Sequence, residues 1–297
     1  MIHKAVIPAA GFGSRFLPAT KSQPKEMLPI VDTPVIQYVV EEAVEAGITD
    51  ILMVIGKGKR SIEEHFDRNF QLEKQLLDKG KEVELKAIQR ISELADIHFV
   101  WQKELKGLGD AVYCARHHVN NEPFVVLLGD TVMEAVTPPA KQLLDIFERY
   151  HEPVVLLEEL ERSQVSRYGV IDGRKVDTGL YLVKDFIEKP SVEEAPSNLV
   201  IAGRYVLTPD IFEYLSRTTP SKDGEIQLTD AMRIMVKDRS MYGLRLNGRR
   251  CDIGTKEGFV KTNIEFALKR DDIAENLRRF IRQLAKKIEE KDYGHRC

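Results

Sequence analysis

The fold is decided by the stretch Ala5-Val6-Ile7-Pro8-Ala9-Ala10-Gly11-Phe12-Gly13-Ser14-Arg15-Phe16. Its first six residues predict a buried strand, and its two glycines predict a loop at the strand end, where backbone N–H groups can approach a ligand closely. Downstream comes Pro24-Lys25-Glu26-Met27-Leu28-Pro29, so Arg15 and Lys25 bring permanent positive charge to the same neighbourhood. Together these features predict a loop that grips a nucleoside triphosphate.

Two familiar phosphate-binding motifs do not match this loop. A dinucleotide-binding fingerprint has a third glycine three residues after the second, and Phe16 occupies that position. A Walker-type P-loop has Gly-Lys-Ser/Thr after four intervening residues, and no such triplet follows Gly11. Taken alone, Gly-x-Gly is equally compatible with a plain strand-to-loop turn and with a phosphate loop.

The composition excludes several classes of protein. Of the 297 residues, 43% are hydrophobic and 31% charged, which is typical of a soluble globular chain and not of a disordered one. The net charge of −3 argues against non-specific nucleic-acid binding, and no apolar run predicts a signal peptide or a membrane span. The three cysteines, Cys114, Cys251 and Cys297, lack metal-type spacing. We therefore expect them to be reduced thiols in a cytoplasmic protein.

Apolar runs alternate with helical patterns in the first half of the chain. The runs 51–55, 97–101 and 124–128 are nearly continuous, which is typical of strands covered on both faces. This alternation predicts an α/β fold with a Rossmann-like mixed sheet flanked by helices. One helix is expected to be capped by Thr33, to begin at Pro34 and to end at Gly47.

The chain is expected to divide into three parts. Residues 1–254 form one predicted domain, with a nucleotide-binding half at 1–150 and a strand-rich acceptor half at 151–254. Residues 255–297 are predicted to be a helical tail. The charged stretch 71–96 is predicted to be a helical flap or partner surface. One further amphipathic helix is indicated by the apolar residues Leu228, Ala231, Met232, Met235 and Val236.

Two aspartates are candidate ligands for a metal ion. Asp130 follows the apolar strand 124–128 through Gly129, at the strand end where ligands gather in open α/β sheets. Asp252 lies in Arg250-Cys251-Asp252-Ile253-Gly254-Thr255. Each has a plain alternative, because Asp130 can start a turn and Asp252 can cap the following helix. Two carboxylates on one Mg²⁺ are a common means of neutralising a triphosphate.

Three further segments carry candidate binding residues. Gln102 precedes Lys106-Gly107-Leu108-Gly109, and its amide offers both a donor and an acceptor to a pyrimidine edge. Lys189 follows Glu188 in Phe186-Ile187-Glu188-Lys189-Pro190, where a surface Glu–Lys pair is the plainer explanation. Gly169 permits close approach of a ligand to a strand. An ordinary glycine turn remains open for the segment around Gly107.

The order of these motifs resembles the bacterial UTP–glucose-1-phosphate uridylyltransferases over essentially the whole chain. The matching segments also include Gly203-Arg204-Tyr205 and Glu225-Ile226-Gln227-Leu228-Thr229-Asp230. Lys25-Glu26 favours this family, because related dTDP-sugar pyrophosphorylases usually carry Lys-Gln there. The resemblance implies a sugar-nucleotidyltransferase fold and the reaction of UTP with glucose 1-phosphate to UDP-glucose and pyrophosphate, with Mg²⁺.

The resemblance also implies a role for each matching position. Uracil and ribose would contact Ala9, Ala10, Gly11, Glu26, Gln102 and Gly107. The triphosphate would contact Gly13, Ser14, Arg15 and Lys25. Mg²⁺ would be held by Asp130 and Asp252. The glucose hydroxyls would contact Gly169, Glu188 and the backbone near Gly203, and the sugar phosphate Lys189. Arg15, Lys25 and Lys189 would act in catalysis, because the nucleophile is already an anion and needs only positioning and charge neutralisation.

Some positions depart from the family's commonest form. Asp110 stands where His is frequent, and Thr131 where a second acidic residue often follows Asp130. The alternatives are a preference for dTTP or galactose 1-phosphate, a glycosyltransferase, or a non-catalytic nucleotide-sugar-binding protein. A glycosyltransferase is disfavoured because Val132 removes the Asp-x-Asp pattern from Asp130. We expect a homodimer or homotetramer that binds neither nucleic acid nor a membrane.

Overall fold

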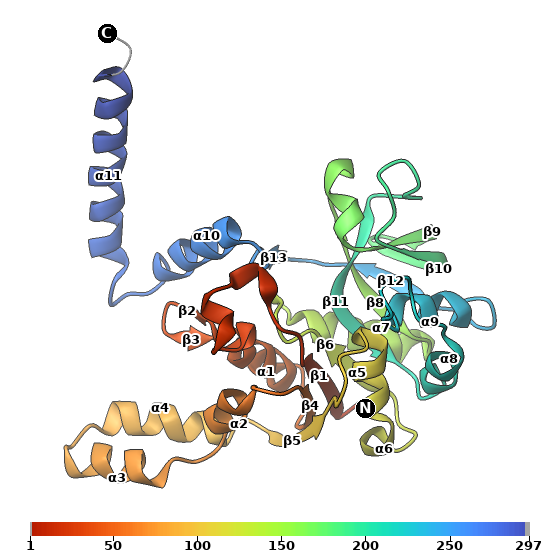
Figure 1. The fold of residues 1–297 in the computed structure, drawn as a ribbon, viewed down its shortest axis with the longest axis horizontal. Helices are drawn as coiled ribbons and strands as arrows, with labels where there is room; N and C mark the ends of the chain where they lie inside the picture. The colour runs from red at the N-terminus through yellow and green to blue at the C-terminus, as the bar shows by residue number, and fades with distance from the viewer. Residues whose placement is uncertain (1, 295–297) are drawn as a thin grey trace.

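A computed structural model describes residues 2–294, and the side chains of residues 2–289. Nine strands form one mixed sheet (Figure 1). In sheet order they are β5 (Asp96–Trp101), β4 (Asp50–Ile55), β1 (Lys4–Ala9), β6 (Phe124–Leu127), β11 (Leu199–Leu207), β8 (Val154–Glu159), β12 (Tyr242–Arg245), β10 (Leu180–Glu188) and β9 (Gly169–Asp177). The order joins strands from both predicted halves of the chain.

The strand directions divide the sheet. Strand β1 pairs in parallel with β4 and β6, and β4 pairs in parallel with β5. Strand β11 runs antiparallel to both β6 and β8. The carboxyl ends of β1, β4, β5 and β6 therefore meet at one edge of the sheet, where ligands bind in open α/β folds.

Helices cover both faces of the sheet. One face carries α1 (Val35–Glu45), α2 (Arg60–Phe66) and α7 (Pro139–Tyr150). The other carries α5 (Leu108–Cys114), α6 (Arg116–Val119), α8 (Ile211–Arg217) and α9 (Leu228–Met235). The predicted amphipathic helix is α9, and its buried residues include Leu228, Ala231, Met232 and Met235.

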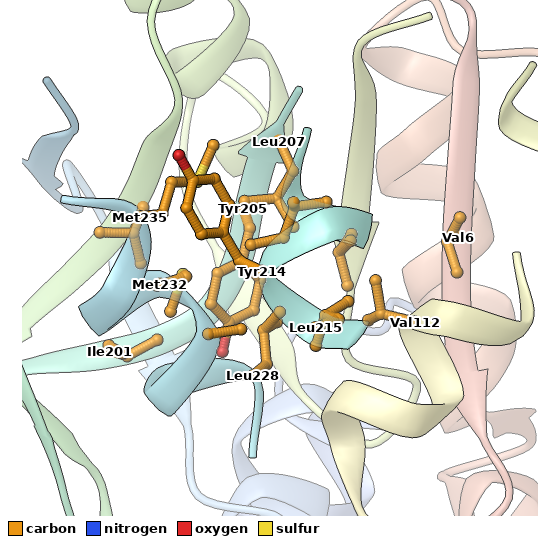
Figure 2. Packing of buried hydrophobic residues seen from close by; sticks show 14 of the residues in the cluster. Val6, Val112, Ile201, Tyr205, Leu207, Tyr214, Leu215, Leu228, Met232 and Met235 are labelled. Carbon is orange, nitrogen blue, oxygen red and sulfur yellow. The ribbon is translucent and has the colours of Figure 1, made fainter. Parts of the chain in front are cut away.

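The alternating strand pattern builds two cores. On β1, Val6 joins the cluster on one face, whereas Ala5 and Ile7 join the cluster on the other. Figure 2 shows the first cluster, in which apolar side chains of α8 and α9 pack near Tyr205 of β11. Burial on both faces holds β1 rigidly, so the loop that follows it starts from a fixed point.

The remaining elements lie at the edges of this core. Short strands pair as β2 (Pro29–Ile30) with β3 (Thr33–Pro34) and as β7 (Val132–Glu134) with β13 (Arg249–Cys251). Short 3₁₀ segments are η1 (Ser14–Phe16), η2 (Ala19–Lys21), η3 (Lys25–Met27) and η4 (Arg162–Arg167). Peripheral helices are α3 (Phe70–Asp78), α4 (Glu82–Ser92), α10 (Lys256–Ala267) and α11 (Ala274–Gly294). In Figure 1, the α3–α4 hairpin and α11 project away from the sheet.

Two local predictions are wrong. The run 97–101 is not a central strand, because β5 lies at the edge of the sheet and the Trp101 side chain is half exposed. Thr33 does not cap α1; it lies in β3, and Pro34 takes the cap position without a side-chain hydrogen bond. The predicted helical stretch and tail are present as α3, α4, α10 and α11, with Thr255 rather than Asp252 capping α10.

Two other expectations concern thiols and membranes. Cys114 and Cys251 are free thiols, whereas Cys297 lies outside the described residues. Within residues 2–294, none of the helices combines the length and the apolar character needed to cross a bilayer.

Candidate active site

The glycine loop begins where β1 ends. Ala9 and Ala10 are buried, and the loop emerges between the ends of β4 and β6. Gly13 has a φ of 68°, and a Cβ on this residue would lie 2.8 Å from Cβ of Lys25. Both the backbone conformation and the close approach of Lys25 therefore require glycine at position 13.

The loop lines a cavity together with Lys25 and Asp130. This cavity measures about 280 Å³, and its lining includes Gly11, Gly13, Ser14 and Arg15. Lys25 Nζ donates to Asp130 Oδ2 at 2.5 Å. Desolvation favours the neutral forms of both groups, but their attraction, their hydrogen bond and neighbouring charges together outweigh it, so the pKa of Asp130 is lowered and that of Lys25 is raised. Both groups are consequently charged at neutral pH.

A second cavity adjoins the first. It measures about 410 Å³ and shares Arg15, Asp130, Ile253 and Gly254 with its neighbour. Its lining adds Asp252 and Gly203, as well as two arginines that were not among the predicted site residues, Arg167 and Arg250. The Asp252 carboxylate accepts hydrogen bonds from the Gly254 N–H at 3.1 Å and from Thr255 Oγ1 at 2.7 Å. The two candidate metal ligands therefore face one cavity.

Glu26 is held by Lys59, which was also not among the predicted site residues. Lys59 Nζ donates to Glu26 Oε2 and to the Gly11 carbonyl oxygen, each at 2.7 Å. Both side chains of this ion pair are almost fully buried. Burial raises the pKa of Glu26 and lowers the pKa of Lys59, against the attraction between them. A possible signal was Gly56-Lys57-Gly58-Lys59, which directly follows β4.

Gln102 and Gly107 meet beyond the end of β5. Gln102 Nε2 donates to the Gly107 carbonyl oxygen at 3.1 Å and to Asp110 Oδ2 at 2.7 Å. Gly107 has a φ of 92°, and a Cβ there would lie 2.8 Å from the Ile226 carbonyl oxygen. Glycine is therefore required at position 107 for both conformation and packing.

Gly169 and Glu188 are paired in register on β9 and β10. A Cβ on Gly169 would lie 3.2 Å from Glu188 Oε2 and 3.1 Å from Thr229 Oγ1. Lys189 has a φ of 45°, an uncommon conformation for a residue with a side chain, and its Nζ lies 3.3 Å from Glu188 Oε1. The plain Glu–Lys pair considered for this segment is thus present, on a strained backbone.

Arg204 holds the backbone on both sides of Asp130 through hydrogen bonds. Its side chain is completely buried and pairs with Glu42 at 2.7 Å. It also donates to the carbonyl oxygens of Leu128 and Thr131, at 3.4 and 2.8 Å. These two carbonyl groups flank Asp130, so Arg204 holds the aspartate in place without lining either cavity.

The predicted site residues therefore fall into four groups. The glycine loop, Lys25 and Asp130 line the first cavity, and Asp252 and Gly203 line the second. Two further groups lie outside the linings of these two cavities. One contains Ala9, Ala10, Glu26, Gln102 and Gly107, and the other contains Gly169, Glu188 and Lys189.

Comparisons with known proteins identify the family. Residues 4–268 match the family model described as nucleotidyl transferase. The chain belongs to the nucleotidyl transferase family. A relative from Staphylococcus epidermidis, named UTP–glucose-1-phosphate uridylyltransferase, is 52% identical over 95% of this chain and 98% of its own. A Bacillus subtilis relative with the same name is 49% identical over 97% of this chain and 99% of its own.

Solved structures of nucleotidyl transferases confirm the fold. A UDP-glucose pyrophosphorylase complexed with UDP-glucose is 44% identical, with a TM-score of 0.83 over 91% of this chain and 100% of that one. A UTP-bound enzyme from Acinetobacter baumannii is 37% identical, with a TM-score of 0.89 over 96% of this chain and 100% of that one. The predicted α/β class and the family resemblance are confirmed.

Proposed function

We propose that this chain transfers UMP from UTP to α-D-glucose 1-phosphate, giving UDP-glucose and pyrophosphate. The observation that carries the proposal is the pair of adjoining cavities that share Arg15 and Asp130. One cavity is built on a glycine loop suited to phosphates, and the other extends toward the strand-rich half. This arrangement supports two phosphorylated substrates meeting at one set of charges. The names of relatives about 50% identical support the same reaction.

For this reaction the protein needs mainly to position the two substrates and to neutralise the charge of their phosphates. A phosphate oxygen of the sugar attacks the α-phosphorus of UTP in line, its P–O bond forms, and the bond to pyrophosphate breaks. The nucleophile is already an anion, so no general base is needed. We assign Lys25 and Arg15 to the triphosphate and Lys189 to the sugar phosphate, because opposed cations offset the repulsion between the substrates. Gly13 and Ser14 supply backbone contacts at the loop.

The residues at the cavity junction fit Mg²⁺. Asp130 and Asp252 offer carboxylate oxygens to the same cavity, and such hard ligands suit this ion. Within the described part of the chain, no cluster of three or more His, Cys, Asp or Glu side chains could hold a metal alone. That result suits a site completed by substrate phosphates and water. When bound, Mg²⁺ would neutralise charge on the phosphates.

The remaining predicted residues are assigned to recognition of base, ribose and sugar. We assign the nucleoside to Ala9, Ala10, Gly11, Glu26, Gln102 and Gly107. We assign the glucose hydroxyls to Gly169, Glu188 and the backbone at Gly203. The support is that Gln102 and Gly107 are joined by a hydrogen bond, as Glu26 and Gly11 are joined through Lys59. Gly169 likewise leaves room beside Glu188.

A substrate-matrix assay tests this function. Pyrophosphate release would be measured with Mg²⁺ for UTP and dTTP, each combined with glucose 1-phosphate and galactose 1-phosphate. The proposal expects the highest kcat/KM for UTP with glucose 1-phosphate. A higher value for another pair would reassign the substrates. UTP binding without any pyrophosphate release would instead favour a non-catalytic nucleotide-sugar-binding protein.

We further propose a homodimer or homotetramer in the cytoplasm. Helix α11 carries three exposed apolar residues at spacings of four, Phe280, Leu284 and Ile288, which would gain from contact with a second copy. Light scattering of the intact protein and of Leu284→Lys would test this surface, with a smaller particle expected for the variant. The free thiols support a reducing compartment. We retain the proposed division at residues 1–150, 151–254 and 255–297.

A further inference from the structure

Asp110 limits the orientation of the Gln102 side chain. The Gln102 amide has two N–H donors and one carbonyl oxygen. Its nitrogen contacts the Gly107 carbonyl oxygen at 3.1 Å and Asp110 Oδ2 at 2.7 Å. A backbone carbonyl and a carboxylate can only accept hydrogen bonds. If the amide turned over, its oxygen would face two acceptors and both donors would lose their partners.

The consequence is that the Gln102 side-chain oxygen is turned away from Gly107 and Asp110. The fully buried side-chain atoms without a partner, within the part of the chain that the structure describes, are Ser61 Oγ and Ser221 Oγ. Gln102 Oε1 is not one of them, and it accepts no hydrogen bond from any described residue. This oxygen is therefore still accessible and can accept one hydrogen bond from a bound molecule.

The position of Gln102 suits contact with a nucleobase. Its backbone N–H donates to the Ile55 carbonyl oxygen at 2.8 Å, which places Gln102 beside the end of β4. Gly56, the residue directly after β4, approaches Ala10, since a Cβ there would lie 2.9 Å from the Ala10 carbonyl oxygen. Gln102 thus lies at the same sheet edge as the residue that opens the glycine loop.

We propose that Asp110 is a specificity-determining residue: it fixes the Gln102 amide so that Oε1 accepts the N3–H of uracil and opposes the bare N3 of cytosine. The inference rests on the proposed function and deepens it by assigning the base discrimination to a pair of residues. Thymine also carries N3–H, so this device separates UTP from CTP and does not separate UTP from dTTP. Asp110 touches Gln102 and acts through it.

The test compares nucleotide affinities across a small set of variants. Calorimetry would give the dissociation constants of UTP, dTTP and CTP for the wild type, Asp110→Asn and Asp110→Leu. Asn can donate to Oε1 as well as accept, and Leu can do neither, so each variant removes the carboxylate acceptor and weakens the constraint on the amide that Asp110 shares with the Gly107 carbonyl group. We expect the CTP/UTP ratio of dissociation constants to fall about tenfold, the effect of one hydrogen bond, with an unchanged dTTP/UTP ratio.

Two controls separate this role from a structural one. Glu104 is an exposed residue of the same loop, and its carboxylate pairs with Lys106. Glu104→Gln removes this carboxylate and should leave both ratios of dissociation constants unchanged. Asp110→Glu keeps an acceptor and should restore part of the discrimination. Asp110 also lies in the first turn of α5, where a carboxylate stabilises the helix.

If that helix contribution were its only role, the melting temperature would fall and the CTP/UTP ratio would stay constant, which would overturn the inference. Binding is measured without turnover. Failure of UTP transfer in the wild type would therefore overturn the proposed function alone.

Discussion

Lys59 and Glu26 form an ion pair enclosed by protein, with Nζ and Oε2 2.7 Å apart. The same ammonium group also bonds the Gly11 carbonyl oxygen, so one buried charge ties the glycine loop to the Lys25-Glu26 segment. Burial lowers the pKa of Lys59 and raises that of Glu26, against the attraction between them. Removal of either partner would therefore leave the other charge buried and unpaired.

Replacement of Lys59 by Met should destabilise the protein by about 3–5 kcal/mol, because Glu26 is left buried without a partner. The double variant Lys59→Met with Glu26→Gln should recover much of this loss in chemical denaturation. Equal losses in the single and double variants would contradict a coupled pair. The KM for UTP should rise in the single variant, since Gly11 loses its support.

Lys189→Ala and Asp130→Asn should each lower turnover by about 10²-fold or more, by analogy with the loss of a preorganised charge. Both variants should remain folded, as judged by circular dichroism. Lys184→Ala is the matched control, because Lys184 is an exposed lysine on β10, and its turnover should be unchanged. Near-normal turnover in either folded test variant would remove that residue from the proposed machinery.

Gly169→Ala should raise the KM for glucose 1-phosphate and leave the KM for UTP nearly unchanged. The added methyl group would lie 2.8 Å from Cδ1 of Ile201 and close to both Glu188 and Thr229. Those side chains must shift, which disturbs the proposed sugar site. Steady-state kinetics with each substrate varied in turn would check this, and a rise confined to the UTP KM would contradict it.

Arg204→Met should cost about 3–5 kcal/mol of folding stability, because it leaves the buried Glu42 carboxylate unpaired. Turnover should also fall, since the carbonyl groups of Leu128 and Thr131 lose a common donor beside Asp130. The comparison is Arg233→Met, which breaks a more exposed pair with Asp185 and should cost at most about 1 kcal/mol. Similar losses at the two arginines would refute the argument from burial.

The stability of the protein should depend on Cys251 above pH 9. Burial raises the pKa of this thiol from 9.0 to about 11 in the folded chain. A raised pKa stabilises the fold fully below pH 9, and that contribution is lost as the pH rises through 11. The free energy of unfolding of the wild type should therefore fall relative to Cys251→Ala between pH 9 and 11. A constant difference across this range would show that the thiol is not desolvated.

The sequence predicted the features that depend on local pattern. The strand and glycine loop of β1, helix α9 and the two tail helices follow from runs and spacings within one segment. The edge position of β5 does not follow from local pattern, because an apolar run gives no information on whether a strand has one neighbour or two.

Polar contacts between residues far apart in the chain could likewise not be predicted from local sequence patterns. Arg204 and Glu42 are 162 residues apart, and nothing near either one indicates a completely buried guanidinium. Lys59 resembles any lysine at the start of a helix until Glu26 and Gly11 are seen beside it. Asp110 departs from the family's commonest residue, but its contact with Gln102 appears only in three dimensions.

Strand β11 has a consequence for how the enzyme can move. It pairs with β6 on one side and with β8 on the other, across one irregularity between Ile201 and Tyr205, so the proposed nucleotide-binding and acceptor halves share one sheet. A hinge between these halves would have to break the strand pairings of β11. Substrate enclosure must therefore come from small elements above the sheet edge, such as the glycine loop, and the catalytic cycle should proceed with an almost stationary scaffold.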